Sequence, residues 1–317
     1  MRLVFCGTPR FAVPTMEALL RAGHEMALVV SQPDRPVGRA QELTAPPVKQ
    51  TALAAGLPIT QPDKIRNNEE FRARLEAIAP DAIVVVAYGR IIPAWMLALP
   101  RLGCINLHAS LLPRYRGAAP IQWAIAMGES ATGNTTMLLD EGLDTGPILL
   151  QQALAIGPEQ TAPELFDELA RGGAPLVVDT LARLDAGTLE PRPQNPAGAT
   201  LAPLLKREDG LMNFAARTAV ELKNRWRGFQ PWPGAFTFWN GKKLIVHRME
   251  VTAGADVLSE ISETGRVIVQ DDRMIAACAQ GTWLELAEVQ LEGKKRVTAA
   301  EFLHGLQPGA RAGLRFG

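Results

Sequence analysis

Three polar side chains occur at every second position near the end of an apolar segment: Asn106, His108 and Ser110, within GCINLHASLLPRYRG (residues 103–117). Because side chains alternate between the two faces of a β-strand, all three share one face if the strand continues that far. An imidazole can transfer a proton near neutral pH, and an amide NH2 can donate to an oxygen that gains negative charge. Residues 103–117 therefore combine groups suited to proton transfer and to oxyanion stabilisation.

A second polar segment, LDEGLDTGP (residues 139–147), contains Asp140, Glu141 and Asp144 and follows a predicted strand. In open α/β sheets, ligands bind outside the carboxyl ends of the strands, so we expect His108 and Asp144 to meet across neighbouring strands. A carboxylate beside an imidazole can orient the ring or stabilise its charged form. With Asn106, such a pair suits direct acyl transfer, in which an amine attacks a carbonyl carbon without a covalent enzyme intermediate.

Structural roles for the same residues are also consistent with the pattern. A single histidine at a strand end is most often structural, and Asn106 can bond to its own backbone. An aspartate in a glycine-rich loop, such as Asp144, is typical of a turn. The residue types alone therefore favour catalytic and structural roles about equally.

Three common motifs of α/β proteins are absent. The turn GTPRFAVP has a single glycine where a dinucleotide fold needs GxGxxG, and Asn134 occupies the lysine position of the P-loop-like GESATGN. Ser110 lies in HASLL rather than in the GxSxG of a nucleophile elbow. These differences argue against nucleotide phosphate binding and against hydrolase chemistry of the α/β-hydrolase type.

The elements that position these segments follow an alternating pattern of apolar strands and amphipathic helices over residues 1–187. This pattern predicts an α/β domain with a Rossmann-like, mostly parallel sheet. The expected strands are residues 3–7, 25–31, 81–89, 103–108, 135–140 and 147–154, and the expected helices are 11–23, 71–79 and 163–184.

The rest of the chain has a different pattern. Residues 188–205 are rich in proline and predict a stiff, extended linker. Residues 206–317 form the second predicted domain, in which a helix precedes five short strands that suggest a small OB-like β-barrel. The expected helix is residues 213–229, and the expected strands are 235–239, 242–251, 265–270, 274–279 and 283–289.

Composition limits the possible functions. The chain begins directly with a predicted strand and has no long apolar run, so we expect a cytoplasmic protein without membrane contact. Its three cysteines form no CxxC pair and its four histidines are scattered, which predicts buried thiols and no metal site. Residues 206–317 carry 16 Lys and Arg against 13 Asp and Glu. That small positive excess permits a polyanionic partner.

NLHASLLPRYRGAAPIQWAI, with LDEGLDTG some 30 residues later, resembles the signature of folate-dependent formyltransferases. QPDRPVGR (residues 32–39) and the length resemble those members that act on methionyl-tRNA. The resemblance implies transfer of the formyl group of 10-formyltetrahydrofolate to the amino group of initiator methionyl-tRNA, for translation initiation. It implies no metal, and we expect a monomer.

The resemblance also implies roles for individual residues. Asn106 would hold the formyl oxygen, while His108 and Asp144 would complete the catalytic trio. Folate would be bound by Tyr88, Ile91, Ser110, Leu111, Leu112, Pro113 and Asp140. The loop after QPDRP would contact tRNA through Arg39, although Gln41 and Glu42 stand where relatives often have lysines. From the charge of the second domain we expect further phosphate contacts at Lys242, Lys243, Lys294, Lys295 and Arg296.

Three other functions agree less well with the sequence. A small amine acceptor, such as glycinamide ribonucleotide or an amino sugar nucleotide, fits poorly, because the purine-pathway relatives lack a C-terminal barrel and the sugar-modifying ones lack the QPDRP loop. Hydrolysis of formyltetrahydrofolate would be accompanied by a regulatory domain, which is not visible. A non-catalytic RNA-binding module is disfavoured because Asn106, His108 and Asp144 are all present.

Overall fold

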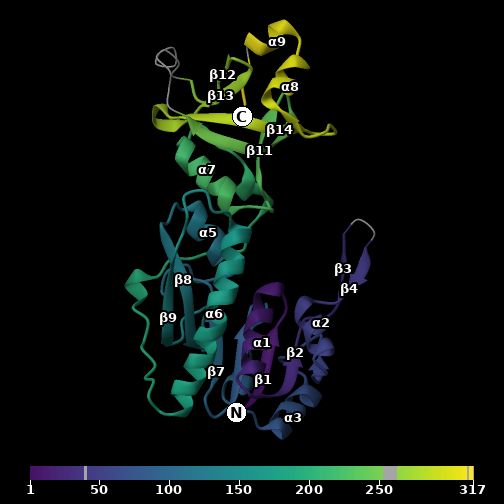
Figure 1. Ribbon diagram of the computed structural model, residues 1–317, viewed down its shortest axis with the longest axis vertical. Coiled ribbons are helices and arrows are strands. Elements are labelled where there is room, and N and C mark those ends of the chain that lie inside the picture. The colour runs from purple at the N-terminus through teal and green to yellow at the C-terminus, as the bar shows by residue number, and fades with distance from the viewer. Residues whose placement is uncertain (39–40, 253–262, 313, 317) are drawn as a thin grey trace. The chain divides into compact units, whose positions relative to one another are not determined.

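The computed structural model describes residues 1–317 except 39–40, 253–262, 313 and 317 (Figure 1). The chain divides into two compact units. The first comprises residues 1–121, 131–156 and 164–203, and the second comprises residues 122–130, 157–163 and 204–317. None of the helices in the described part of the chain combines the length and the apolar character that a membrane crossing requires.

The first unit is built on a seven-stranded sheet with the order β5-β2-β1-β6-β7-β8-β9. Neighbouring strands from β5 to β7 pair in parallel, whereas β8 is antiparallel to both β7 and β9. The mostly parallel sheet and its six expected strands are thus confirmed, and the short β5 was not expected. The strands are β1 Arg2–Gly7, β2 Glu25–Val30, β5 Ile59–Thr60, β6 Ala82–Val86, β7 Cys104–His108, β8 Ala131–Leu138 and β9 Ile148–Ala155.

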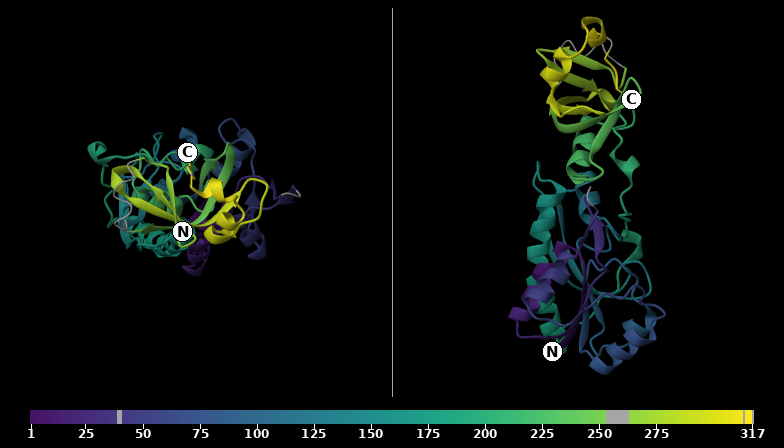
Figure 2. Two further views of the ribbon diagram at one scale, coloured as in Figure 1. Left: turned by 90° about the horizontal axis from the view of Figure 1, so that it is seen from above. Right: turned by 90° about the vertical axis from the view of Figure 1, so that its right-hand side faces the viewer.

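Helices cover both faces of this sheet (Figure 2). On one face, α1 (Val13–Arg21) and α6 (Ala162–Asp185) lie together. The ring of Phe11, just before α1, meets the ring of Phe166 in α6 edge to face, with 5.1 Å between the ring centres. On the other face, Phe71 and Leu75 of α3 (Glu69–Ile78) pack with strand residues such as Val85, and α4 (Ala94–Leu97) adds Met96. The remaining helices of this unit are η1 Arg10–Ala12 and α2 Pro47–Ala54, while most of α5 (Pro120–Ala126) belongs to the second unit.

The three thiols are free and buried, as expected from the sequence. Burial raises the pKa of Cys104 and of Cys278 to about 12 in each case. Cys6 is buried near Cys104, and both burial and that neighbour raise its pKa. Because the thiolate is the reactive form of cysteine, none of these side chains is a nucleophile at neutral pH.

The loop expected after QPDRP contains a two-stranded hairpin, β3 (Arg35–Val37) with β4 (Glu42–Thr44). Asp34 anchors its base, since its carboxylate accepts from Lys49 Nζ at 2.8 Å and from Gln61 Nε2 at 2.8 Å. The hydrogen bond from Lys49, followed by that from Gln61, lowers the pKa of Asp34. Arg39 lies outside the described residues, so its role stays a prediction.

Residues 188–203, here called the connecting segment, are hydrogen-bonded to the first unit. Arg192 and Ile148 exchange two backbone hydrogen bonds of 2.8 Å each, and Arg116 and Leu201 form a parallel bridge. The segment was expected to be part of an extended linker. In the structure these residues count among those of the first unit.

The second unit contains an antiparallel sheet with the order β10-β11-β14-β13-β12, and β15 pairs with β14. All five expected strands are present, while their closure into a barrel stays a prediction. The helix expected over residues 213–229 begins only at Ala219, because Thr218 and Glu221 form a capping box there. The elements are α7 Ala219–Gly228, β10 Ala235–Trp239, β11 Lys242–Thr252, β12 Val267–Gln270, β13 Arg273–Ala277, β14 Trp283–Leu291, β15 Val297–Thr298, α8 Ala299–His304 and α9 Pro308–Ala312, with η3 Arg207–Gly210 and η5 Ala279–Gly281 as short 3-10 turns. A further 3-10 turn, η2 Pro196–Gly198, lies in the connecting segment.

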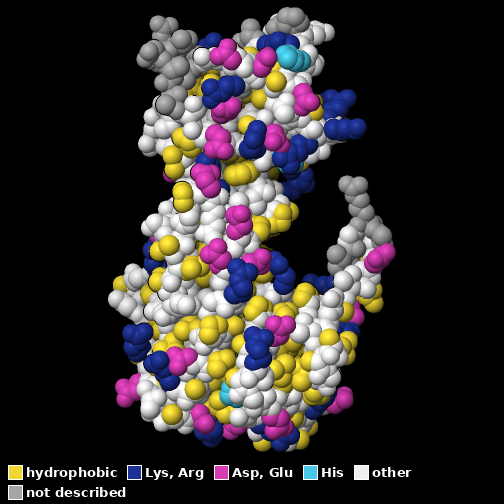
Figure 3. All heavy atoms as spheres, in the orientation of Figure 1, with side chains coloured by type: hydrophobic (Ala, Val, Ile, Leu, Met, Phe, Trp, Pro, Cys, Tyr) yellow, Lys and Arg dark blue, Asp and Glu magenta, His cyan; other side chains and the backbone are white. Residues whose placement is uncertain are grey.

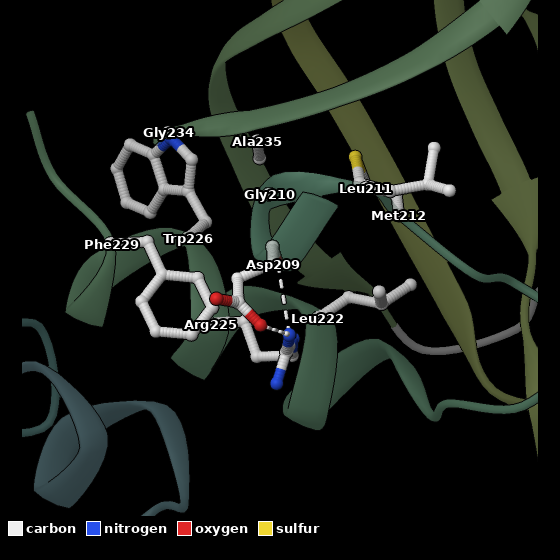
Figure 4. A pocket seen from close by; sticks show the side chains of 10 residues that line it. All are labelled: Asp209, Gly210, Leu211, Met212, Leu222, Arg225, Trp226, Phe229, Gly234 and Ala235. Atoms are coloured by element: carbon white, nitrogen blue, oxygen red, sulfur yellow. Dashed lines mark hydrogen bonds and ion pairs between the residues drawn. The ribbon is translucent and has the colours of Figure 1, made fainter. Parts of the chain in front are cut away.

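A small cavity of about 10 Å³ lies beside α7 in the second unit (Figure 4). Arg225 lines it, donating from Nη2 to the carbonyl of Asp209 at 2.8 Å, and its guanidinium lies 4.7 Å from the centre of the Phe229 ring. A volume of this size holds one water molecule at most. The cavity is a packing gap and has no room for a substrate.

Candidate active site

Asn106 and His108 share one face of β7, as the alternating pattern predicted. Leu107 lies on the other face, where α6 covers it so closely that a Cβ on Gly173 would come within 2.6 Å of Leu107. Cys104 shares the face of Asn106 and His108 and donates from Sγ to the carbonyl of Met96 in α4. Ser110 follows the end of the strand. The carboxyl end of β7 therefore presents the amide and the imidazole together.

His108 is buried, with 7% of its surface exposed, and both ring nitrogens have defined neighbours. Nε2 lies 3.0 Å from the backbone oxygen of Tyr115, and a carbonyl only accepts, so Nε2 carries a hydrogen. Nδ1 lies 3.7 Å from Oδ2 of Asp144. In the neutral ring Nδ1 is therefore the nitrogen that can take up a proton, and Asp144 stands next to it.

Asp144 reaches His108 by a different path from the one expected. Because β8 runs antiparallel to β7, its last residue, Leu138, pairs with Ile105. His108, at the end of β7, pairs with Thr135 in the middle of β8. The loop of residues 139–147 then carries Asp144 to the imidazole, with a positive φ of 52° at Asp144. Oδ2 accepts from the backbone N–H of Gly117 at 2.8 Å. His108 and Asp144 thus lie close together across neighbouring strands, as expected, but the loop after β8 and not the strand end itself brings Asp144 there.

Asn106 has unused hydrogen-bonding capacity. Its Nδ2 donates to the carbonyl of Val85 on β6 at 3.1 Å, which leaves one amide hydrogen. Its Oδ1 is buried and has no hydrogen-bond partner among the described residues. Buried polar atoms are nearly always paired, so an unpaired one points to a partner that binds there.

The turn after β7 is held by side chains from β8 and β9. Thr135 Oγ1 donates to the carbonyl of Ser110 at 2.6 Å and accepts from the N–H of Leu112 at 3.1 Å. Gln151 Nε2 donates to the carbonyl of Leu112 at 2.9 Å. The hydroxyl of Ser110, itself fully buried, donates to the carbonyl of Arg114 at 2.7 Å, so it shapes the turn from within. Leu111 and Pro113 are half-buried at its surface, and the Leu112–Pro113 peptide is cis.

The other residues expected to bind folate lie in different surroundings. Tyr88 is 1% exposed, and its hydroxyl is buried without a partner among the described residues. Burial raises the pKa of Tyr88, so this hydroxyl stays neutral. Ile91 is 88% exposed. Asp140 is exposed and accepts from the N–H of Gly142 at 3.0 Å and from Thr145 Oγ1 at 2.8 Å.

Gln32, in the QPDRP motif, has a role that the sequence did not reveal. Its Nε2 donates to the carbonyls of Tyr88 at 2.8 Å and Gly89 at 3.2 Å, and its backbone N–H donates to Thr8 Oγ1 at 3.3 Å. Gln32 therefore ties together the turns that follow β1, β2 and β6. These turns lie where the strand order reverses, which is the usual place for a ligand in such sheets.

In the second unit, the pairing of β11 with β14 brings two lysine turns together. The N–H of Glu292 donates to the carbonyl of Lys243 at 2.8 Å, and Lys294 follows directly in the turn after β14. Lys243 Nζ lies 3.9 Å from the centre of the Phe236 ring, and burial followed by the nearby Arg207 lowers its pKa. Basic side chains also gather at the edge of this unit in Figure 3. The residues that we call the lysine cluster are Lys242, Lys243, Lys294 and Lys295.

Arg296 differs from the lysine cluster because it already has an anionic partner. Its guanidinium forms a short ion pair with Glu288, which also lies 3.4 Å from Nε of Arg248. Among the described residues, no group of three or more His, Cys, Asp or Glu side chains is arranged to hold a metal ion.

The family model for formyl transferase matches residues 1–181, and the model for its C-terminal domain matches residues 204–307. The chain belongs to the formyl transferase family. This formyl transferase is 64% identical over 315 residues to the methionyl-tRNA formyltransferase of Acidobacterium capsulatum, covering 99% of this chain and 100% of the relative. It is 47% identical to that of Geobacter sulfurreducens, covering 99% of this chain and 97% of the relative.

A solved structure shares the fold of this formyl transferase. A sugar 3N-formyl transferase, crystallised in the presence of dTDP and 5-N-formyl-THF, matches with a TM-score of 0.63 and 18% identity. The match covers 93% of this chain and 99% of that one. At that identity the likeness concerns the fold.

Proposed function

We propose that this formyl transferase moves the formyl group of 10-formyltetrahydrofolate to the free amino group of initiator methionyl-tRNA, for translation initiation. The observation that carries the proposal is His108 Nδ1 at 3.7 Å from Asp144 Oδ2, beside Asn106 on the same strand face. The names of the two relatives described above support the choice of acceptor. We further propose that the chain works as a monomer in the cytoplasm.

The residues present fit a folate formyl donor. Asn106 has a spare amide hydrogen and an unpaired buried oxygen, which suit a formyl oxygen and an N–H group respectively. Leu111 and Pro113 expose apolar surface on the turn after β7. Ile91 adds a further exposed apolar side chain after β6. These groups would bind the donor, which supplies an activated formyl carbon.

Three side chains divide the chemistry. As the new amide bond forms, the carbonyl oxygen of the reacting group gains negative charge, and Asn106 Nδ2 is placed to donate to it. The attacking amine must lose one proton and the departing folate nitrogen must gain one. His108 Nδ1 is the site that can hold this proton, because Nε2 is engaged by the Tyr115 carbonyl. Asp144 then stabilises the charged imidazole across 3.7 Å.

The direct test supplies 10-formyltetrahydrofolate, labelled in the formyl group, to the full-length protein with one acceptor at a time. We expect label on methionyl initiator tRNA and little on methionyl elongator tRNA, on glycinamide ribonucleotide or on an amino sugar nucleotide. Free formate in the absence of acceptor measures hydrolysis. Preferential labelling of a small amine, or release of formate as the main product, would reject the proposed acceptor.

We expect the lysine cluster to bind tRNA phosphates. The double variant Lys242→Ala/Lys294→Ala removes two exposed charges, so it should raise KM for tRNA and make the slope of log(kcat/KM) against log[salt] shallower by about 2, roughly one for each lysine that pairs with a phosphate. Lys64→Ala, an exposed lysine on the first unit, is the control. Unchanged salt dependence in the double variant would show that the cluster is only solvated.

A further inference from the structure

The connecting segment is hydrogen-bonded to the backbone beside both His108 and Asp144, and its Gln194 lies 50 residues after Asp144 in the chain. Gln194 Nε2 donates to the carbonyl of Asp144 at 2.9 Å and to the carbonyl of Gly146 at 2.8 Å. Its Oε1 accepts from Arg116 at 3.0 Å from Nε and 2.7 Å from Nη2. One half-buried amide therefore joins the loop that carries Asp144 to the segment that follows the His108 turn.

Thr200 makes the corresponding contact on the histidine side. Its Oγ1 accepts from the N–H of Tyr115 at 2.8 Å, and the carbonyl of the same Tyr115 accepts from His108 Nε2. Tyr115 has a φ of 60°, a left-handed conformation that a bulky residue adopts only when its surroundings hold it there. The Thr200 side chain thus holds the peptide group directly before the one whose carbonyl orients the imidazole.

The backbone between these two contacts is equally constrained. Arg116 N–H donates to the carbonyl of Thr200 at 2.8 Å, and Ala202 N–H donates to the carbonyl of Arg116 at 2.7 Å. The next residue, Gly117, donates to Asp144 and has a φ of 123°. A Cβ on Gly117 would come within 2.6 Å of the Ala202 backbone oxygen. The two backbone segments therefore approach closely only because this position is glycine.

We propose that Gln194 and Thr200 are positioning residues for the reaction, which set the separation and orientation of His108 and Asp144. The inference rests on the proposed function of that pair. Neither residue needs to touch a substrate. Gln194 holds the backbone on both sides of Thr145, next to Asp144. Thr200 holds the N–H of Tyr115, the residue whose carbonyl selects the hydrogen-bearing nitrogen of His108. Removing either contact frees one member of the pair to move, and a misplacement of about 1 Å can cost about 100-fold in rate.

The test compares two substitutions that differ by one oxygen. Thr200→Val removes the acceptor at nearly constant volume, whereas Thr200→Ser keeps it. We expect Thr200→Val to lower kcat by about 10- to 100-fold with KM for tRNA within about twofold, and Thr200→Ser to restore most of the activity. Gln194→Met should lower kcat by a similar factor. Asn195→Ala is the matched control, because the Asn195 side chain bonds only to the nearby Ala197 N–H in the described structure.

A second measurement is independent of activity. The chain has four histidines, so the imidazole ¹⁵N resonances of His108 can be assigned by comparison with His108→Gln. We expect Thr200→Val and Gln194→Met to shift the His108 resonances while those of His24, His247 and His304 stay in place. If the His108 resonances shift in these variants but the unaltered protein transfers no formyl group, then Gln194 and Thr200 do position His108, and the proposed reaction is rejected.

The opposite results would reject the positioning role. If the unaltered protein transfers formyl groups but Thr200→Val and Gln194→Met retain its kcat, then the connecting segment does not set the geometry of the pair. A lower melting temperature with unchanged kcat and unchanged His108 resonances would assign the two residues to stability alone. Equal losses in Thr200→Ser and Thr200→Val would also contradict the proposal, since Ser keeps the acceptor.

Discussion

Replacing His108 with alanine is expected to lower kcat by about 10²- to 10⁴-fold, the usual contribution of a positioned acid–base group. The reason is that Nδ1 of His108 faces Asp144, whereas Nε2 is already bonded to the Tyr115 carbonyl. KM for the folate donor should change little. Steady-state kinetics with both substrates, together with circular dichroism of the variant, provides the measurement.

His108→Gln separates the chemical role from a structural one. A glutamine amide can donate to the Tyr115 carbonyl as Nε2 does, but it cannot take up a proton at neutral pH. We therefore expect His108→Gln to be as inactive as His108→Ala while retaining more of its stability. If glutamine restores activity, the histidine serves only to hold the turn.

Asp144 provides an internal check on the same idea. If Asp144 acts through His108, the double variant Asp144→Asn/His108→Ala should be little worse than the poorer single variant, because the two residues work as a unit. Fully additive losses would mean that the carboxylate and the imidazole act independently.

The second large effect is expected at Asn106. Asn106→Ala should lower kcat by about 10²- to 10³-fold, the loss seen when one oxyanion donor is removed elsewhere. The side chain bonds to the Val85 carbonyl with one amide hydrogen only, which leaves the other for the reacting oxygen. Single-turnover rates with saturating donor and tRNA would measure the chemical step directly.

Asn134 on β8 is a close structural match and makes a good control. It also donates from Nδ2 to a backbone carbonyl, that of Leu169 at 2.9 Å, and its Oδ1 is also buried without a partner among the described residues. Asn134, however, faces α6, away from His108. Asn134→Ala should therefore cost stability without lowering kcat. Similar kinetic losses in both variants would mean that Asn106 only supports the fold.

Much of the fold follows from local patterns in the sequence. Continuous apolar runs such as residues 82–86 identify the buried parallel strands, and the alternation in β7 places Asn106 and His108 on one face. A local signal for the start of α7 was also present, since Thr218 and Glu221 have capping-box spacing. The broader helical pattern over residues 213–229 concealed it.

Other features have no local signal. The direction of β8 depends on the end of the neighbouring strands at which its connection enters the sheet, and the apolar pattern of TTMLLD is compatible with either direction. Gln194 bonds to atoms 48 to 78 residues away, so nothing beside it in the sequence indicates its partners. Proline-rich composition predicted a linker because it describes the stiffness of residues 188–203, and it gives no information about where their polar side chains find partners.

The connecting segment also decides where this chain can be recombined with a relative. The family model of the N-terminal domain ends at residue 181, and a gene fusion made there would pair the strands and loops of one parent with the Gln194 and Thr200 counterparts of another. Contacts such as Arg116 with Gln194 would then join side chains that were selected in different proteins. A junction placed after Pro203 keeps each of these contacts within one parent, and hybrids built that way can exchange residues 204–317 while the reaction geometry stays intact.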